Sequence, residues 1–163
     1  PLTVKLGLQT IHETSVQYIR RGYVNQVYFD AVKRLKEAGI EVVTHIILGL
    51  PGETAEMMEQ TTRSVIAAGT DGVKFHLLHV LRGTDLEKEY LEGRVPMLSM
   101  EEYLETVAAC IRVLPPDMVI HRLTGDGNKK FLVAPLWSGD KKRVLGAINS
   151  AFEKDRIEQG EGL

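Results

Sequence analysis

The stretch Glu41–Thr54, with the sequence EVVTHIILGLPGET, decides the fold class because three structural signals follow one another in it. A run rich in Val and Ile is typical of a buried strand, and Pro51-Gly52 ends that run. Thr54 then caps a helix. Gly49 and Gly52 allow a ligand to approach the backbone closely, and the turn leaves amides at a helix N-terminus. The same residues equally suit a plain turn between a strand and a helix.

The order of strand, turn and helix recurs along the chain. Strands are predicted at residues 3–9, 41–50, 73–81 and 118–124, and helices at 16–21, 27–38, 54–68, 85–91, 99–114 and 141–153. Alternating strands and helices predict an α/β fold with a parallel sheet. A complete (β/α)8 barrel needs roughly 250 residues. The 163 residues therefore predict a partial (β/α) TIM-like barrel, with about four mostly parallel strands and helices packed on one face; a doubly wound sheet is the competing architecture.

The composition argues against several classes of function. Lys and Arg total 20 against 22 Asp and Glu, a net charge of -2, and aromatic residues make up 6%. Neither value favours a nucleic acid or a membrane surface as partner. The apolar runs are too short to span a bilayer and the first residues do not resemble a signal peptide, so we expect a cytoplasmic protein. The single cysteine, Cys110, cannot form an internal disulfide or supply a cysteine-rich metal or iron–sulfur site, and we interpret it as a core residue of a helix.

Each predicted strand has one apolar face and one mixed face, because side chains alternate along a strand. The mixed faces begin with three charged residues that can form an ion cluster: Lys5, Glu41 and Lys74. Polar residues return near the carboxyl ends, where α/β folds carry their sites: Gln9, His45 and His76. The alternative is that other protein groups satisfy these side chains and that they have no chemical role.

Several short motifs in a fixed order resemble one enzyme superfamily. They are Gly7-Leu8-Gln9-Thr10, Arg20-Arg21-Gly22, Ala38-Gly39-Ile40 and Gly49–Thr54. This order resembles radical S-adenosylmethionine (radical SAM) enzymes, in the branch shared by oxygen-independent coproporphyrinogen oxidases, methylthiotransferases and the elongator catalytic subunit. The continuations Phe75–Thr84 and His121–Gly127 resemble a group of uncharacterised radical SAM proteins within that branch. The resemblance spans Val4 to about Phe152.

The resemblance implies a partial (β/α)6 barrel whose first loop holds three cysteines that ligate a [4Fe–4S] cluster, which cleaves SAM. This chain has no such loop, and its resemblance begins at what would be the fourth strand. It therefore looks like the C-terminal half of a radical SAM protein, at residues 1–153, with a flexible tail at 154–163. We expect SAM and the cluster in the full-length parent, an oxidoreductase or transferase. In the isolated chain we expect no bound cofactor, no metal, no catalytic residue and no activity.

The expected partners follow from the same resemblance and from the open barrel. They are the missing N-terminal half of the protein, a small-molecule or unidentified substrate, and a second copy of the chain. An open barrel face or edge leaves unpaired strand groups, which favour association into a homo-oligomer. No membrane and no nucleic acid is expected.

The positions that match the family's motifs give the candidate site residues. For the cofactor they are Gln9, Arg21, His45, Gly49, Leu50, His79, Val80 and Leu81, and for the substrate they are Arg122 and Asp126. The Gln9 amide suits ribose or carboxylate groups, and Arg21 suits a carboxylate. His45 stands where relatives often carry Asp, and main-chain groups of residues 79–81 are expected to meet adenine.

Two other interpretations stay open. The chain can be a stand-alone α/β module that binds a nucleotide or phosphate through the Gly49–Thr54 turn. It can also be a metal-dependent hydrolase that uses His45 and His76, although His76 and His79 fall on opposite strand faces and no acidic residue near the strand ends completes a ligand set. Trp137 is predicted to anchor the last helix, with substrate stacking as the alternative.

Overall fold

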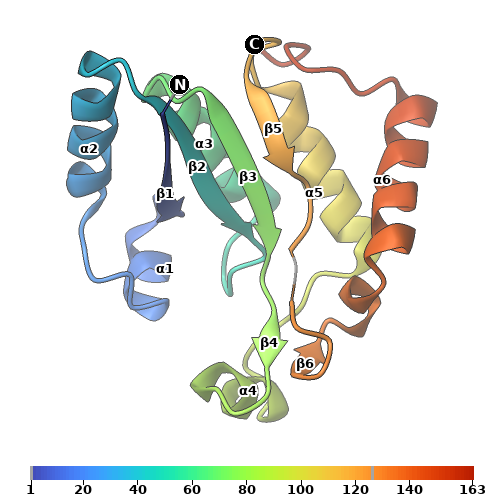
Figure 1. Cartoon of the computed structure of the whole chain (residues 1–163). Coiled ribbons are helices and arrows are strands. Elements are labelled where there is room, and N and C mark those ends of the chain that lie inside the picture. The colour runs from blue at the N-terminus through green and yellow to red at the C-terminus, as the bar shows by residue number, and fades with distance from the viewer. Residues whose placement is uncertain (1, 126) are drawn as a thin grey trace.

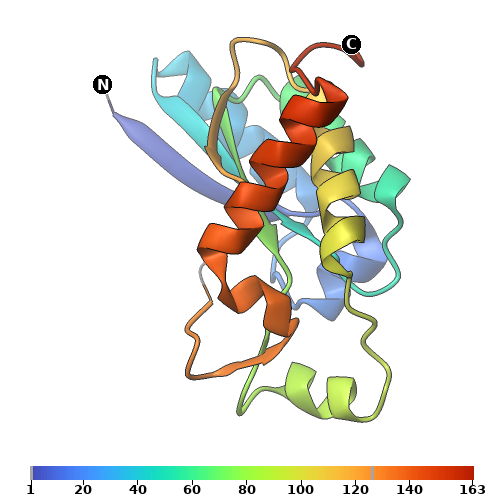
Figure 2. The same ribbon diagram turned by 90° about the vertical axis from the view of Figure 1, so that its right-hand side faces the viewer.

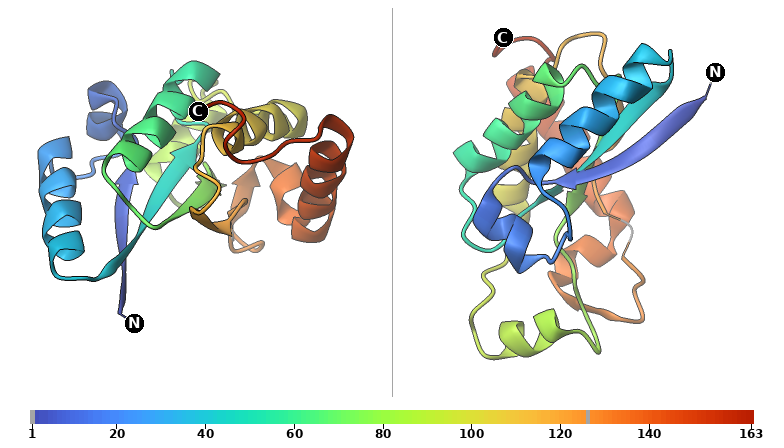
Figure 3. Two further views of the ribbon diagram at one scale, coloured as in Figure 1. Left: turned by 90° about the horizontal axis from the view of Figure 1, so that it is seen from above. Right: turned by 90° about the vertical axis from the view of Figure 1, so that its left-hand side faces the viewer.

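A four-stranded parallel sheet forms the centre of the computed structural model, which describes residues 2–125 and 127–163 (Figure 1). Across the sheet the order is β1 (Thr3–Gln9), β2 (Glu41–Leu48), β3 (Gly72–Leu77) and β5 (Val119–Arg122). All neighbouring pairs in it are parallel. From above, α2 (Asn25–Glu37), α3 (Ala55–Ala67) and α5 (Met100–Arg112) form an arc on one side of the sheet (Figure 3). The predicted partial α/β barrel, with helices on one face, is confirmed.

The face of the sheet beneath these helices, called here the helix face, contains most of the core. In β2, Val42, Ile46 and Leu48 are turned toward the helices and are fully buried. His45 and Ile47 alternate with them and point to the opposite face, called here the open face, where they are only partly buried. The predicted period of two along this strand is therefore confirmed, and it gives the sheet one apolar and one mixed face.

Local capping signals place the starts of α3 and α5 where the sequence predicts them. The Thr54 side chain accepts a hydrogen bond from the Met57 amide and starts α3. Ser99 and Glu102 form the predicted capping box, in which each side chain bonds the other residue's amide, and α5 follows. Such caps satisfy amides that have no partner inside the helix, so these boundaries are strongly specified.

The second half of the predicted strand at 73–81 is wrong. The Leu78 amide still donates to the Leu48 carbonyl oxygen at 2.9 Å, but the chain then leaves the sheet. Val80–Leu81 forms β4, which pairs antiparallel with β6 (Leu132–Ala134), a strand that the sequence did not predict. The partner segment lies far along the chain, so a local apolar pattern does not show where one strand ends and the other begins.

The first short helix is also shifted relative to the prediction at 16–21. Helix α1 is Glu13–Tyr18, and it stops before Arg21 because Arg20 adopts a left-handed conformation with φ 54°. Two further short elements are α4 (Asp85–Leu91) and the 3-10 helix η1 (Leu136–Gly139).

The C-terminal helix α6 (Lys141–Asp155) lies beside α5 (Figure 2). It runs two residues past its predicted end at 153 and stops at Arg156, whose φ is 48°. Part of the segment predicted to be a flexible tail folds back against the body of the protein. The Gln159 amide donates to the carbonyl oxygens of Pro115 and Met118, at 2.8 and 3.0 Å. Among the described residues, no helix combines the length and the apolar character needed to cross a membrane.

Candidate functional site

A cavity of about 300 Å³ opens at the carboxyl ends of β1, β2 and β3. Its lining residues are Gln9, His45, Ile47, His76, Leu77, Leu78 and His79. The parallel register brings them together, because Gln9 lies opposite Ile46 and Ile47 lies opposite His76. Three of the predicted cofactor-binding residues, Gln9, His45 and His79, therefore share one cavity with His76.

The two imidazoles of His45 and His76 form the polar centre of this cavity. Their ring centroids are 5.1 Å apart and the rings are tilted by 33°. Burial, followed by the nearby His45 and Arg122, lowers the pKa of His76 to about 4. Burial, followed by Lys74, also lowers the pKa of His45. Both rings are therefore neutral near pH 7, and each Nε2 atom is buried without a hydrogen-bond partner among the described residues. A neutral ring with a free nitrogen suits a hydroxyl group of a ligand.

Gln9 enters the cavity from a strained end of β1. Its φ is 67°, a conformation that residues other than glycine adopt rarely. The amide lies back over Gly7, where a Cβ atom would stand 2.7 Å from the Gln9 Nε2 atom. Tyr23 contacts the same glycine, because its hydroxyl donates to the Gly7 carbonyl oxygen. Strain of this kind persists where the surroundings fix it and is common at ligand sites.

The turn at Gly49 and Leu50 is packed rather than open. Gly49 has φ 87°, its amide donates to the Met58 sulfur at 3.1 Å, and a Cβ atom there would stand 3.2 Å from Leu98. Leu50 is buried against Leu78 and Val95. Both residues pack against Leu77 or Leu78 of the cavity lining, and their assignment to the cofactor stays a prediction.

Glu53, at the end of that turn, is a candidate site residue that the sequence analysis did not single out. One carboxylate oxygen accepts a hydrogen bond from the Thr10 hydroxyl at 2.5 Å. The other, Oε2, is buried and has no partner among the residues that the structure describes. An acidic residue that follows a glycine-rich turn at the carboxyl edge of a sheet was the signal available for finding it.

Arg21, which the sequence predicts to suit a carboxylate, is surrounded by hydrogen-bond acceptors of the chain itself. Its five N–H groups make five hydrogen bonds to the chain. The acceptors are the carbonyl oxygens of Leu8, Thr10 and Tyr23 and the side chain of Asn25. The guanidinium also lies 4.6 Å from the centre of the Tyr23 ring. Arg21 therefore ties the end of β1 to the start of α2, and binding a carboxylate would break one of these bonds.

His79 stands where the chain turns from β3 into β4, and two glycines enclose its ring. A Cβ atom on Gly125 would lie 2.7 Å from the ring, and one on Gly127 would lie 2.6 Å from it. Nothing larger than glycine fits at either position while the ring stays where it is. The segment that contains Gly125 and Gly127 therefore seats a cavity residue. The substrate candidate Asp126 lies outside the described residues.

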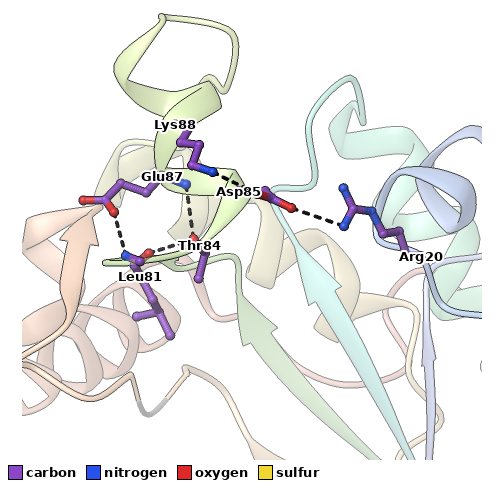
Figure 4. Close-up of polar contacts among 7 residues, drawn as sticks. Arg20, Leu81, Thr84, Asp85, Glu87 and Lys88 are labelled. Carbon is purple, nitrogen blue, oxygen red and sulfur yellow. Dashed lines mark hydrogen bonds and ion pairs between the residues drawn. The ribbon is translucent and has the colours of Figure 1, made fainter.

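The segment after His79 is held in the small β4–β6 sheet. Val80 is fully buried and pairs with Ala134, and Leu81 pairs with Leu132. Figure 4 shows how the following turn is fixed, with the Thr84 hydroxyl donating to the Leu81 carbonyl oxygen at 2.7 Å. Only His79 of the three predicted adenine-contacting residues lines the cavity.

Helix α4 is tethered to α1 beside the carboxyl edge of the sheet. Arg20 and Asp85 form an ion pair of 3.3 Å (Figure 4), and the Tyr18 hydroxyl donates to Glu89 at 2.8 Å. Asp85 also pairs with Lys88 at 3.4 Å. These contacts are exposed, so each of them contributes little to the free energy of unfolding. Their role is to hold α4 in position beside α1.

The remaining predicted residues have the following places. Arg122 lies on β5 opposite Lys74, below the cavity and on the open face. Cys110 is buried in α5, as expected. Trp137 donates from its indole nitrogen to the Leu98 carbonyl oxygen at 3.1 Å and packs on Tyr103, which agrees with the predicted anchor.

The fold and the cavity together define an α/β protein with a cavity at the carboxyl ends of a parallel sheet. The sequence profile of the Radical SAM superfamily matches residues 1–65, and that of the Radical_SAM C-terminal domain matches residues 70–154. The chain therefore belongs to the radical SAM superfamily, which confirms the resemblance found in the motifs.

Two curated relatives match nearly the whole chain. YtqA from Bacillus subtilis is 41% identical over 160 residues, which are 98% of this chain and 50% of YtqA. YhcC from Escherichia coli K12 is 35% identical over 160 residues, 98% of this chain and 52% of YhcC. The chain thus spans about half the length of the curated relatives that it matches.

A solved structure shows the same fold. The archaeal Methanocaldococcus infernus Elp3 with an N-terminal deletion matches with a TM-score of 0.86 at 22% identity. The match covers 97% of this chain and 37% of the Elp3 chain.

Proposed function

We propose that this chain forms part of the SAM- and substrate-binding surface of a radical SAM enzyme whose [4Fe–4S] cluster is bound elsewhere in the whole protein. The observation that carries the proposal is the cavity in which Gln9, His45, His76 and His79 meet. It stands at the carboxyl ends of the strands, the usual place for a site in such folds. Membership of the superfamily supports SAM as the ligand class.

The residues of this chain do not fit the cluster itself. A [4Fe–4S] cluster needs several cysteine thiolates, and the sequence has one cysteine. Cys110 is buried in α5, and burial raises the pKa of its thiol to about 12. No step is therefore assigned to a cluster held by these residues, and the isolated chain is expected to be inactive.

The cavity does fit the nucleoside part of SAM. The Nε2 atoms of His45 and His76 are buried polar atoms that lack a partner among the described residues, and a ligand hydroxyl would supply one. The Gln9 amide offers both a donor and an acceptor beside them. In the family, SAM and the cluster supply hydrogen-atom abstraction when bound. The part of this chain is to hold and orient the nucleoside and to exclude water around it.

The two alternatives from the sequence have less support. A phosphate held by the Gly49–Thr54 turn would need free amides, but the Gly49 amide already donates to Met58. A hydrolytic metal centre would need three or more ligands, and the part of the chain that the structure describes contains no such group of His, Cys, Asp or Glu. Association into a homo-oligomer stays a prediction.

Calorimetric titration of the chain with S-adenosylhomocysteine and with adenosine tests the proposal. We expect both to bind, and we expect His76→Ala and Gln9→Ala each to weaken binding about tenfold, because each removes one hydrogen bond to the ligand. Gln17→Ala is the matched control, since Gln17 is exposed on α1 and bonds only Glu13. Absence of nucleoside binding, or an equal effect of the two glutamine substitutions, would contradict the proposal.

A second measurement tests where the cluster is bound. Anaerobic treatment of the chain with iron and sulfide is expected to yield no cluster absorbance, because thiolate ligands are missing. A chain that takes up a cubane cluster would contradict the assignment of the cluster to another part of the protein.

A further inference from the structure

Gln9, the cavity residue at the end of β1, is the central residue of a three-residue turn. The Thr10 amide donates to the Leu8 carbonyl oxygen at 2.8 Å, and between these residues Gln9 has φ 67°. A turn of this kind is rare and strained at a residue that has a side chain. The pairing of β1 with β2 shifts at the same place, between Gly7 and Gln9. The position of the Gln9 amide in the cavity therefore depends on how firmly this turn is held.

The backbone of the turn is held by Arg21. Its Nη1 atom donates to the carbonyl oxygens of Leu8 and Thr10, at 2.8 and 3.0 Å. These are the residues on either side of Gln9, so one guanidinium nitrogen restrains both ends of the turn. A second contact restrains the Thr10 side chain.

That second contact links the turn at Gln9 to the turn that follows β2. Thr10 is fully buried, and its hydroxyl donates to the Glu53 Oε1 atom at 2.5 Å and accepts from the His12 amide at 3.1 Å. Glu53 and Thr10 follow neighbouring strands and are 43 residues apart in the sequence. The hydrogen bond therefore ties the residue after Gln9 to a distant part of the chain.

The Glu53 carboxylate is a costly group to place at this contact. Its second oxygen, Oε2, is buried and has no hydrogen-bond partner among the described residues. Removing a carboxylate oxygen from water without such a partner is unfavourable, and an unsatisfied buried group in a native structure calls for an explanation. The explanation available in this structure is the effect of the Thr10 contact on Gln9, the next residue along the chain.

We infer that Glu53 is a positioning residue for the nucleoside, which acts through the Thr10 hydroxyl to keep Gln9 in its left-handed conformation. The inference rests on the proposed function, because it takes Gln9 to be a ligand-binding residue. A buried hydrogen bond and the strain of a left-handed residue have free energies of similar size, so loss of this bond would relax the turn in part of the molecules. The Gln9 amide would then leave its place in the cavity that it shares with His45.

Removing the Thr10 hydroxyl tests the inference in the complete chain. Thr10→Val keeps the shape of the side chain, and we expect it to weaken adenosine binding about fivefold to tenfold in a calorimetric titration. Thr70→Val is the matched control, because Thr70 is also buried and its hydroxyl donates to the Val65 carbonyl oxygen at 3.2 Å, before the start of β3. This control should bind adenosine as the unmodified chain does, and urea denaturation shows that each variant is folded.

A double-mutant cycle shows whether the effect passes through Gln9. Thr10→Val introduced into Gln9→Ala should weaken adenosine binding by less than about a further twofold, because the amide that it displaces is already absent. Glu53→Leu should act as Thr10→Val does, whereas Glu53→Gln keeps an acceptor oxygen and should bind within about twofold of the unmodified chain. Independent effects in the cycle, or equal losses in both Glu53 variants, would overturn the inference.

The NMR signals of the Gln9 side-chain amide give a readout that needs no ligand. They should move in Thr10→Val and in Glu53→Leu and stay close to their place in Thr10→Ser, which keeps the hydroxyl. Adenosine binding that Thr10→Val leaves unchanged would remove the positioning role and leave the proposed function standing. If the unmodified chain binds no nucleoside, the proposed function fails, and the Gln9 signals alone then decide whether Glu53 and Thr10 hold the turn.

Discussion

The two faces of the sheet use the same strands and have opposite chemistry. On the helix face, Val42, Ile46 and Phe75 are fully buried under α2, α3 and α5. On the open face the same strands present His45 and Lys74, and no ion pair found among the described residues includes either of them. A buried parallel strand is usually apolar on both faces. Among the described residues the helices are thus the packing partner of one face of these strands, and a partner for the other face stays a prediction.

Within the open face, the effect of burial differs between imidazole and ammonium groups. Burial lowers the pKa of His45, His76 and Lys74 alike. The pKa of a histidine starts near 6.5, so lowering it leaves the ring neutral at pH 7, whereas the pKa of a lysine starts near 10.4. The neutral rings of His45 and His76 therefore suit hydroxyl groups of a ligand, and the ammonium group of Lys74 suits a carboxylate.

The largest effect on the free energy of unfolding is expected when one large side chain on each face is shortened to alanine. Phe75→Ala removes a fully buried ring from the helix face and should cost about 3–5 kcal/mol in the free energy of unfolding. Ile47→Ala removes a partly buried side chain from the open face and should cost about 1 kcal/mol. Urea denaturation followed by circular dichroism measures both. Equal costs would mean that the open face is already packed as a core.

A smaller effect is expected at the glycines that enclose His79. Gly127→Ala places a methyl group 2.6 Å from the imidazole and should cost about 1–3 kcal/mol while moving the His79 ring. Gly146→Ala is the control, because Gly146 is exposed in α6 with open space around it, and there the change should stabilise by about 1 kcal/mol. Urea denaturation gives the energies, and imidazole NMR signals report the ring. An unmoved His79 signal in Gly127→Ala would contradict the seating role.

The sequence predicts best the features that depend on neighbouring residues. The β2–α3 unit follows from the Val/Ile pattern, the Pro51-Gly52 break and the Thr54 cap, all within one stretch. The gathering of Gln9 and His45 follows from the rule that carboxyl ends of parallel strands meet at one edge. These signals are local or topological, so one sequence is enough to detect them.

Features that depend on distant partners were predicted poorly. β4 and β6 pair across a long separation, and Arg21 is surrounded by acceptors from three segments. A motif match identifies the residue type at such a position, but it does not show which groups already occupy its hydrogen-bonding capacity. Glu53 was missed for the same reason, because its hydrogen bond with Thr10 joins residues far apart in the sequence.

The neutral His76 ring on the open face should make the stability of the protein depend on pH. The native pKa of His76 is about 4, below the unfolded value near 6.5, so the unfolded chain binds the proton first as pH falls. Stability contributed by the neutral ring is complete above about pH 6.5 and is lost as the pH falls toward about 4. We expect a loss of about 1 kcal/mol over this range, since solvent screens a half-buried ring. Comparing the pH profile of His76→Gln with that of the unmodified chain isolates the effect, and identical profiles would contradict it.

The smallest effect is expected for the charge of Lys74 on the open face. The informative result is whether its removal raises or lowers the stability. In the isolated chain Lys74 faces like charges from Lys5 and Arg122, so Lys74→Met should stabilise by about 0.5 kcal/mol or less. Lys33→Met, which removes an exposed pair with Glu37, should lower stability by a similar amount. Urea midpoints at low and high salt measure both changes, and salt should reduce each. A Lys74→Met variant that is less stable than the unmodified chain would mean that Lys74 has a favourable partner within these residues. A more stable one would confirm that the charges of Lys5 and Arg122 disfavour the charged form of Lys74 in this chain.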